Sequence, residues 1–347
     1  MKSPDKPGIP APIAALRLHR AARIDDAFLE WRAQRGRRRG LQATVIPYTG
    51  YGSTTWVRVL ARVLLTKPDL SRAATPAQRV RGWRSFTSIP VVGAEVTITV
   101  GAETHVVTAD RGGVVDARLA VELAPGWQQI TLQAEDSRPV VENVFIVAPT
   151  VRFGVISDID DTVMVTALPR PLVAAWNTFV LDEHARTPVP GMAVFLERIV
   201  REHAGSPVIY LSTGAWNVAP TLSRFLTRHL YPSGALLLTD WGPTHDRFFR
   251  SGRAHKATNL RRLAEEFPEI KWLLVGDDGQ HDEELYGEFS AEFPNNVAAV
   301  AIRQLSPGEA VLAGGRSKPE EHATRISWVY APDGAGLLQQ LDAIDLA

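Results

Sequence analysis

Short apolar runs alternate with helix-like segments over the second half of the chain, and this alternation restricts the fold more than any other feature. Continuous apolar strands that alternate with helices are typical of an α/β domain whose parallel sheet is covered on both faces. Ligands of such sheets bind at the carboxyl ends of the strands, so we expect the chemistry directly after the apolar runs. The helix-like segments lie near residues 191–204, 216–230, 256–267, 282–290 and 334–343. The runs are FGVIS, PVIYLS, ALLLT, WLLVGD, NVAAVAI and ISWVYA.

The segment of about 41–149 has a different pattern. It contains short stretches rich in valine and aromatic residues, several with period-two alternation, separated by turn signals such as DRGG. This pattern, without a long helical segment, predicts an antiparallel β-sandwich of the immunoglobulin or transthyretin kind. We therefore expect three parts, with an N-terminal tail and helix over 1–40, the sandwich over 41–149 and the α/β domain over 150–347.

The first 40 residues combine a proline-rich start with a basic helical segment. We expect residues 1–12 to be disordered, and apolar residues recur at helical spacing from Ile13 to Gln34, with arginines on the other faces. Such an amphipathic helix can make peripheral contact with an anionic membrane. It can equally dock on its own protein and leave a solvated basic face, which is the more common arrangement.

Composition excludes several classes of protein. The formal net charge is zero, so we expect no nucleic-acid partner in the absence of a local basic patch. The chain has no cysteine, which excludes disulfides, thiol catalysis and zinc bound by cysteine. No apolar run reaches about 18 residues and the start lacks a secretory hydrophobic segment. We expect a cytoplasmic protein, with peripheral membrane contact as the alternative.

Polar and charged side chains follow several of the apolar runs. The candidates are Asp158, Asp160, Ser212, Asp277 and Asp278 at strand ends, and Lys256 at the start of a helix. The first two carboxylates are two residues apart, so in an extended strand end both leave on the same side. Carboxylates for a cation, donors for phosphate oxygens and an acid–base group together indicate phosphoryl transfer.

The same residues carry a resemblance to a known family. DIDDT at 158–162 matches the DxDxT signature of the haloacid dehalogenase superfamily, and VIYLS, Lys256 and GDDGQHD match its three later motifs in order. SDIDDTV, NTF ahead of PVPGM, YLSTGAWN and GDDGQHDEELY resemble the magnesium-dependent phosphatidate phosphatases related to the yeast actin-patch phosphatase. The resemblance covers about residues 150–305 and continues more weakly in PYTGYG near the N-terminus. It implies a haloacid dehalogenase-like, Rossmannoid parallel sheet.

The resemblance also implies roles for single residues. Asp158 would attack phosphorus and form an aspartyl-phosphate, and Asp160 would protonate the leaving alkoxide and then accept a proton from water. Ser212 would donate a hydrogen bond to a phosphoryl oxygen, and Lys256 would hold the nucleophile and neutralise charge. Thr162 is expected to bond to the backbone of the nucleophile turn, whereas Trp216 can line the pocket or belong to the core. The expected substrate-binding residues are Thr162, Thr213, Gly214, Trp216 and Asn217.

Mg²⁺ is the expected cofactor, because it prefers oxygen ligands from one or two carboxylates. The resemblance implies that Asp158, the backbone carbonyl of Asp160 and Asp277 are its ligands. Asp278 or Asp282 would orient a water on the cation, and the sequence does not separate these two.

The segment over about 163–190 stands where this superfamily inserts a cap, and its shortness predicts an open site. An open site suits a lipid headgroup or a phosphoprotein. The leading hypothesis is a Mg²⁺-dependent phosphatase with phosphatidate as the substrate that the resemblance implies. The alternatives are a soluble phosphomonoesterase acting on a small metabolite or a phosphoprotein, and a non-catalytic scaffold that binds a membrane or a protein.

Overall fold

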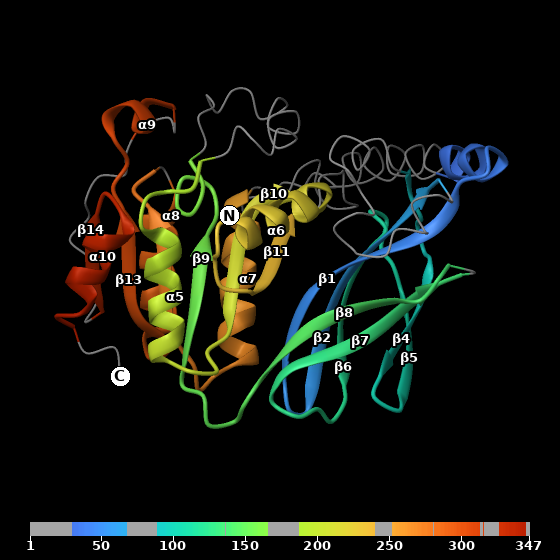
Figure 1. Ribbon diagram of the computed structural model, residues 1–347, viewed down its shortest axis with the longest axis horizontal. Coiled ribbons are helices and arrows are strands. Elements are labelled where there is room, and N and C mark those ends of the chain that lie inside the picture. Colours follow the sequence, from blue (N-terminus) through green and yellow to red (C-terminus); the bar gives the residue numbers. More distant parts are fainter. Residues whose placement is uncertain are drawn as a thin grey trace, which may run out of the picture.

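A computed structural model of the 347-residue chain shows two β-sheets packed side by side, with helices on one of them (Figure 1). The residues that it describes are 30–67, 89–135, 137–165, 187–239, 252–279, 281–312, 315 and 326–344. Most of the predicted cap, most of the helix predicted from Ile13 to Gln34 and the predicted disordered start lie outside these residues. No helix in the described ranges combines the length and the hydrophobicity needed to cross a bilayer.

The C-terminal half forms sheet B, whose six strands are all parallel, as the alternation of apolar runs predicts. Its order is β11-β10-β9-β12-β13-β14. The strands are β9 (Phe153–Asp158), β10 (Val208–Ala215), β11 (Ala235–Thr239), β12 (Lys271–Asp277), β13 (Val297–Arg303) and β14 (Ser327–Ala331). The chain moves outward from β9 to β11 and then returns to the other side of β9, so the order reverses between β9 and β12. Such a reversal is where open parallel sheets bind their ligands.

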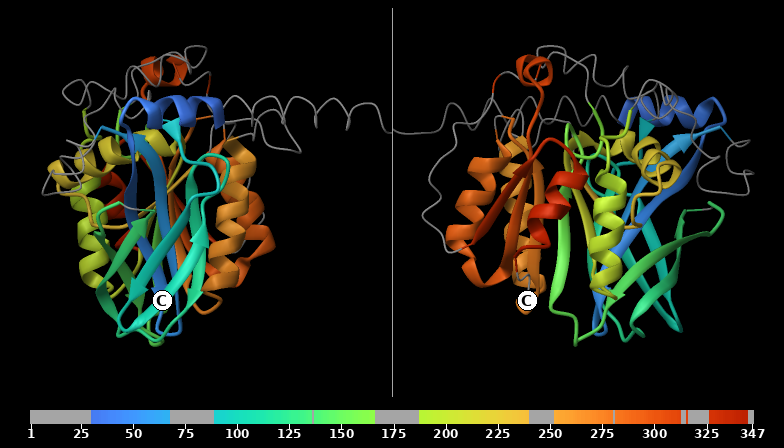
Figure 2. Two further views of the ribbon diagram at one scale, coloured as in Figure 1. Left: turned by 90° about the vertical axis from the view of Figure 1, so that its right-hand side faces the viewer. Right: turned by 60° about the vertical axis from the view of Figure 1, so that its left-hand side comes forward.

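Helices cover both faces of sheet B. In Figure 2, α5 and α10 lie on one face, and α7 and α8 lie on the other. The helices are α5 (Met192–Glu202), α6 (Ala219–Arg228), α7 (Gly252–Glu266), α8 (Asp282–Glu292), α9 (Pro307–Leu312) and α10 (Gly334–Leu341), with short 3₁₀ turns η3 (Trp216–Val218) and η4 (Pro294–Asn296). Because both faces are covered, β9 and β11 are buried at every residue, which explains why their sequences are apolar without alternation.

The N-terminal half forms sheet A, a single mixed sheet of eight strands that curls round its own core (Figure 1). The main path is β3-β2-β1-β8-β7-β4-β5, and β6 also pairs with β2. The strands are β1 (Gln42–Ser53), β2 (Trp56–Thr66), β3 (Ile89–Pro90), β4 (Glu95–Val100), β5 (Glu103–Thr108), β6 (Val114–Ala120), β7 (Gly126–Ala134) and β8 (Val140–Val147).

This arrangement corrects the prediction of an antiparallel sandwich in two respects. The β1–β8 pair is parallel, and the strands are hydrogen-bonded as one sheet rather than as two stacked sheets. Two hairpins, β1–β2 and β7–β8, meet side by side through β1 and β8, and right-handed twist then rolls the long sheet around its apolar side chains. Strand content and turns follow from local sequence, whereas the partner of β1 depends on contacts nearly a hundred residues away.

The two sheets share one hydrophobic core. Tyr48, Tyr51 and Trp56 on the outer face of β1 and β2 belong to the same buried cluster as the side chains of sheet B. Trp56 and Phe267 bring their ring centroids to 5.3 Å, and Arg58 places its Nη2 2.6 Å from Oε1 of Glu266 at the end of α7. Both faces of β1 and β2 are therefore buried, one in each core.

Candidate functional site

Two aspartates end adjacent central strands of sheet B, where the strand order reverses. Asp158 is the last residue of β9 and Asp277 is the last residue of β12. In the pairing of these strands Val275 lies opposite Ser157, so the two strand ends are nearly level. Asp158 is only 2% exposed and Asp277 only 7%, which is rare for carboxylates unless they meet a cation.

Lys256 reaches this pair of strands from α7. Its Nζ lies 2.6 Å from Asp158 Oδ1 and 2.7 Å from Asp282 Oδ1. Burial alone would lower the pKa of the Lys256 ammonium, but the charges of Asp158 and Asp282 outweigh burial and raise that pKa above its ordinary value. Lys256 is therefore a fixed cation that joins the nucleophile candidate to the first turn of α8.

A second acidic contribution comes from α8, which begins at Asp282 directly behind β12. Gly276 allows this approach, because a Cβ at that position would stand 2.8 Å from Asp282 Oδ2 and 2.7 Å from the Tyr286 ring. One carboxylate oxygen from each of Asp158, Asp277 and Asp282 lies within 4.8 Å of the others. The three acids form the acidic cluster of the candidate site.

The acidic cluster fits a hard divalent cation. Burial, and then the neighbouring carboxylates, raise the pKa of Asp158 and of Asp277 well above the ordinary value for aspartate, although Lys256 opposes this effect. Within the described residues Asp282 Oδ2 is buried and receives no hydrogen bond. Three converging carboxylate oxygens with one lysine leave excess negative charge, and oxygen ligands of this kind suit Mg²⁺.

Asp160 and Ser212 form a hydrogen-bonded pair beside the acidic cluster. The Ser212 hydroxyl donates to Asp160 Oδ2 at 3.0 Å, and the backbone N–H of Gly214 donates to Ser212 Oγ at 2.9 Å. Thr239, at the end of β11, donates its hydroxyl to the Thr213 carbonyl at 3.1 Å. The C-terminal end of β10 therefore holds Ser212 in one orientation toward Asp160.

The turn after β9 is tied to β13 by an arginine that the sequence analysis missed. Asp161 has φ 58, in the left-handed region that aspartate and asparagine tolerate better than most residues. Arg303, the last residue of β13, donates from Nη1 to the Asp161 carbonyl at 2.7 Å and from Nη2 to Glu309 at 2.7 Å. The only signal in the sequence is a charged residue at the end of the apolar run NVAAVAI, where Arg303 stands beside the other strand-end residues.

Two expected residues take other positions. Asp278 accepts a hydrogen bond on Oδ1 from the Leu305 backbone at 2.8 Å, and its carboxylate is not one of the three in the acidic cluster. Asp282, and not Asp278, therefore stands with the two strand-end aspartates. Thr162 donates to Asp277 Oδ2 at 3.4 Å and not to the backbone of the turn, because its side chain is buried beneath the strand end.

The remaining substrate-binding candidates divide between core and surface. Trp216 is 5% exposed and packs on Tyr48 of sheet A, so it is a core residue that supports the end of β10. Thr213 is exposed and stands against the start of α7, where a Cβ at Gly252 would lie 2.5 Å from its Cγ2. Asn217 is half-buried in η3. Tyr48 was missed as a support of this strand end, although PYTGYG draws attention to its segment.

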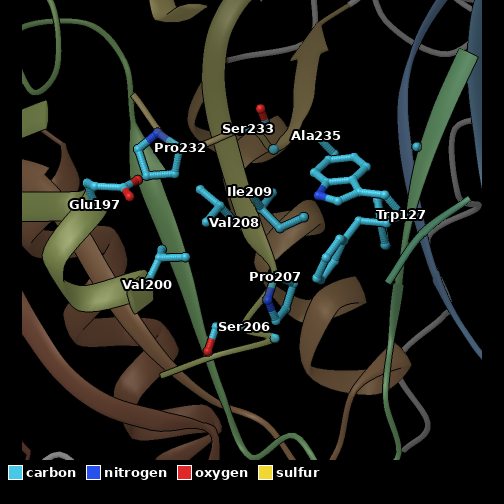
Figure 3. A pocket seen from close by; sticks show the side chains of 15 residues that line it. Trp127, Glu197, Val200, Ser206, Pro207, Val208, Ile209, Pro232, Ser233 and Ala235 are labelled. Atoms are coloured by element: carbon cyan, nitrogen blue, oxygen red, sulfur yellow. The ribbon is translucent and has the colours of Figure 1, made fainter. Parts of the chain in front are cut away.

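A separate hollow of about 290 Å³ lies at the opposite end of sheet B, between the two sheets (Figure 3). It is lined by the first residues of β10 and β11, Val208 and Ala235, and by Trp127 and Phe145 of sheet A. The strand starts and the strand ends lie at opposite edges of a parallel sheet, so this hollow is distinct from the candidate site.

Comparison with known proteins gives a match over the same region. Residues 153–304 match the family model described as "Phosphatidate phosphatase APP1, catalytic domain". Phosphatidate phosphatase APP1 of Saccharomyces cerevisiae is 25% identical over 154 residues, which cover 44% of this chain and 26% of that protein. An uncharacterized protein of Schizosaccharomyces pombe is 27% identical over 154 residues, which cover 44% of this chain and 25% of that protein. The match therefore spans about a quarter of the length of either relative.

The solved structures that align with this chain are distant. A carbohydrate acetylesterase from Xanthomonas citri aligns with a TM-score of 0.33 and 9% identity over 84% of this chain and 69% of its own, which is too distant to inform fold or function. The family model covers sheet B from β9 to the end of β13, including the acidic cluster, Ser212 and Lys256. The resemblance predicted from the motifs is confirmed: over residues 153–304 this chain resembles the catalytic domain of the phosphatidate phosphatase APP1 family.

Proposed function

We propose that this chain is a Mg²⁺-dependent phosphatase that hydrolyses a phosphomonoester through an aspartyl-phosphate on Asp158. The observation that carries the proposal is the contact of the buried Asp158 carboxylate with Lys256 Nζ at 2.6 Å, within the acidic cluster at the reversal of strand order. A match to a phosphatase catalytic domain over the same residues supports it. Buried, oriented carboxylates at strand ends suit a nucleophile better than a solvated turn does.

The cation would be held by Asp158, Asp277 and Asp282. When bound, it supplies positive charge that offsets the charge of these carboxylates and of the phosphoryl oxygens. The high pKa values of Asp158 and Asp277 and the unsatisfied Asp282 Oδ2 support a requirement for such charge.

The side chains of this chain would then act in two steps. A carboxylate oxygen of Asp158 attacks phosphorus while Asp160 gives its proton to the departing alkoxide, which leaves as an alcohol. In the second step Asp160 takes a proton from a water that attacks the phosphorus, which releases phosphate and restores the Asp158 carboxylate. The hydrogen bond from Ser212 to Asp160 Oδ2 orients the acid, and Lys256 holds Asp158 and stabilises charge on the phosphoryl group.

A haloacid dehalogenase-like fold belongs to the same proposal. It is supported by a parallel sheet in which DIDDT follows a central strand, a lysine arrives from the helix before β12, and acidic residues follow β12. In the sheet these strands stand in the order β10, β9, β12, so the DIDDT motif lies between the strand of Ser212 and the strand of Asp277.

Phosphatidate is the proposed substrate, with diacylglycerol and phosphate as products. The support is the name of the family and of the yeast relative, to which the match extends over about a quarter of its length. A soluble phosphomonoester is the alternative substrate class, because the chemistry at Asp158 is the same for either.

The test is phosphate release from phosphatidate, lysophosphatidate, sugar phosphates and phosphopeptides, with and without Mg²⁺. Asp158→Asn should abolish release from every substrate that wild type hydrolyses. The matched control is Asp161→Asn in the same turn, because asparagine tolerates the left-handed backbone at φ 58 and Asp161 contributes its carbonyl and not its side chain to Arg303. If wild type and Asp158→Asn release equal amounts throughout the panel, the proposed chemistry is wrong. Release from the soluble substrates without release from phosphatidate would refute only the lipid assignment.

A further inference from the structure

We propose that the outer face of the helix over residues 30–38, together with Arg39, docks the protein on an anionic lipid bilayer. This basic face is defined by Trp31, Arg35, Arg38 and Arg39. The proposal rests on the proposed function in one respect, since a lipid substrate gives the docking its purpose. The docking itself is a binding event that does not require turnover.

The inner side of the helix is fixed on sheet A by small residues. Gly36 is buried, and a Cβ there would stand 3.1 Å from the side chains of Leu65 and Ile89. Ala33 packs against the core of the same sheet. Over residues 30–38 the helix is therefore docked on its own protein, and its small apolar side is not available to a membrane.

Arg37 anchors the helix from another direction. Its guanidinium binds the Glu135 carboxylate at the end of β7 through two hydrogen bonds of 2.8 and 2.6 Å. A bidentate pair of this kind fixes orientation as well as position. With Gly36 and Arg37 both committed to sheet A, the direction in which the remaining side chains point is set.

The basic face combines an indole with arginines. Trp31 is 54% exposed, and the Arg35 guanidinium carbon lies 5.7 Å from the centre of its ring. Gln34 joins the four residues of the basic face in lining a shallow hollow of about 230 Å³. In the described part of the chain no carboxylate forms an ion pair with Arg35, Arg38 or Arg39. An exposed indole beside arginines suits the headgroup region of a bilayer, where the ring meets the acyl boundary and the guanidinium groups meet phosphates.

The basic face and the candidate site lie at the same end of the molecule. In Figures 1 and 2 the helix over residues 30–38 lies at the same end of the molecule as α9, which follows the end of β13. The acidic cluster also lies at the carboxyl ends of the strands of sheet B. A bilayer that contacts the basic face therefore faces the edge of the molecule that carries the candidate site.

This common orientation favours a bilayer over a nucleic acid. The whole chain has a formal net charge of zero, so the arginines of the basic face are a local concentration and not part of a general positive surface. A nucleic acid could use the same arginines, but it would give no reason for their placement at the edge that carries the acidic cluster. Each arginine near an anionic bilayer strengthens binding by roughly fivefold.

The experiment measures sedimentation of the full chain with vesicles of phosphatidylcholine, alone and mixed with phosphatidylserine. Wild type should bind the mixed vesicles, bind phosphatidylcholine much more weakly, and lose affinity as salt is added. Changing Arg35, Arg38 and Arg39 together to glutamate should weaken binding by at least about 100-fold, because loss of the three positive charges alone removes a factor of about five each. Trp31→Ala should weaken binding several-fold while leaving the salt dependence in place.

The matched control is a triple change to glutamate at Arg152, Arg201 and Arg261, which alters net charge equally at exposed positions elsewhere. It should bind the mixed vesicles like wild type, and thermal melts should show that both triple variants are folded. Equal binding by the basic-face variant and wild type would overturn the proposal. Binding to a single-stranded RNA that is tighter than binding to the mixed vesicles would also overturn it.

Asp158→Asn separates this proposal from the proposed function. This variant should sediment with the mixed vesicles like wild type, because the acidic cluster takes no part in docking. If wild type binds vesicles but releases no phosphate from any substrate, the enzyme assignment fails and the docking stands. If the protein releases phosphate from soluble substrates but does not sediment with the mixed vesicles, the docking fails and the enzyme assignment stands.

Discussion

Tyr48 of β1 stacks on Trp216 of η3, with ring centroids 4.8 Å apart and ring planes inclined by 22°. The Tyr48 hydroxyl also donates to the Trp216 carbonyl at 3.2 Å. Trp216 directly follows β10, whose last residues include Ser212 and Gly214, and Ser212 contacts Asp160. A residue of sheet A thus supports the strand end that orients the proposed general acid.

Two substitutions of Tyr48 should separate the contribution of its hydroxyl to stability from the contribution of its ring. Tyr48→Phe removes one hydrogen bond and should cost about 0.5–1.5 kcal/mol of unfolding free energy. Tyr48→Ala also removes a buried aromatic ring and should cost about 3–5 kcal/mol, as large-to-small changes in cores do. Urea unfolding measures both values. Phosphate release should fall in the same order, with rescue by phenylalanine, and equal behaviour of the two variants would contradict a role for the stacked ring.

Mg²⁺ should stabilise the folded protein through the acidic cluster. A ligand that binds only the native state at about 100 times its dissociation constant adds about 2.7 kcal/mol, which for a chain of this size raises Tm by roughly 4 °C. Asp282→Asn should reduce this Mg²⁺-dependent increase in Tm, because it removes charge from one of the three converging carboxylates. Asp278→Asn is the control, since asparagine can still accept the hydrogen bond from Leu305. A shift that is lost in Asp278→Asn and kept in Asp282→Asn would reverse the assignment.

The strands of sheet B could be predicted because a strand buried on both faces is apolar without alternation. A run such as ALLLT can therefore be recognised as a strand from its own residues. The position of the site could be predicted for the same reason. The carboxyl ends of parallel strands meet at one edge of the sheet, which brings Asp158 and Asp277 together. Spacing alone could not choose between Asp278 and Asp282. That choice depends on how closely α8 approaches β12, and Gly276 permits the approach.

Sheet A was harder to predict because its pairing depends on distant segments. The alternation in β2 indicated one buried face, yet Leu60 and Leu64 are buried against sheet B while Val59 and Val63 are buried inside sheet A. The sequence pattern of a strand buried on both faces in this way resembles that of a strand in a sandwich. The parallel pairing of β1 with β8, the stacking of Tyr48 on Trp216 and the bond from Arg303 to Asp161 join segments whose separation hides them from any local pattern.

The contact between the two sheets should be sensitive to Glu266. Its carboxylate accepts hydrogen bonds from Arg58 and from the Tyr51 hydroxyl, which lies 2.9 Å from Oε2. Glu266→Ala leaves the Arg58 side chain, only 12% exposed, with Asp116 as its remaining ion-pair partner and removes the acceptor of the buried Tyr51 hydroxyl, and should cost about 1–3 kcal/mol in urea unfolding. Glu265→Ala, at the exposed neighbouring position, is the control and should stay within about 0.5 kcal/mol of wild type.

The same experiment examines whether the sheets unfold together. Because one buried cluster contains side chains of both sheets, wild type should unfold in a single transition when near-ultraviolet circular dichroism and far-ultraviolet circular dichroism are compared. Two separated transitions in wild type would mean that the shared core does not couple the sheets.

Stability should depend on pH through Glu309, which binds the arginine that holds the turn after β9. Burial alone would raise the pKa of Glu309, but hydrogen bonds from the Arg303 guanidinium and the Ser306 N–H outweigh it and lower the pKa below its ordinary value of 4.5. A carboxyl with a lowered pKa in the folded state stabilises the protein above its unfolded pKa, and this contribution is lost as the pH falls through the folded pKa.

Glu309→Gln removes the charge and should abolish this pH dependence. Wild type should therefore have the higher Tm from neutral pH down to about 4.5, and the difference should shrink as the pH falls further. Thermal melts across this range measure the difference directly. A difference that stays constant at all pH values would mean that the Glu309 charge does not stabilise Arg303. In that case the hold of Arg303 on the Asp161 carbonyl would have to depend on its bond to the Pro332 carbonyl instead.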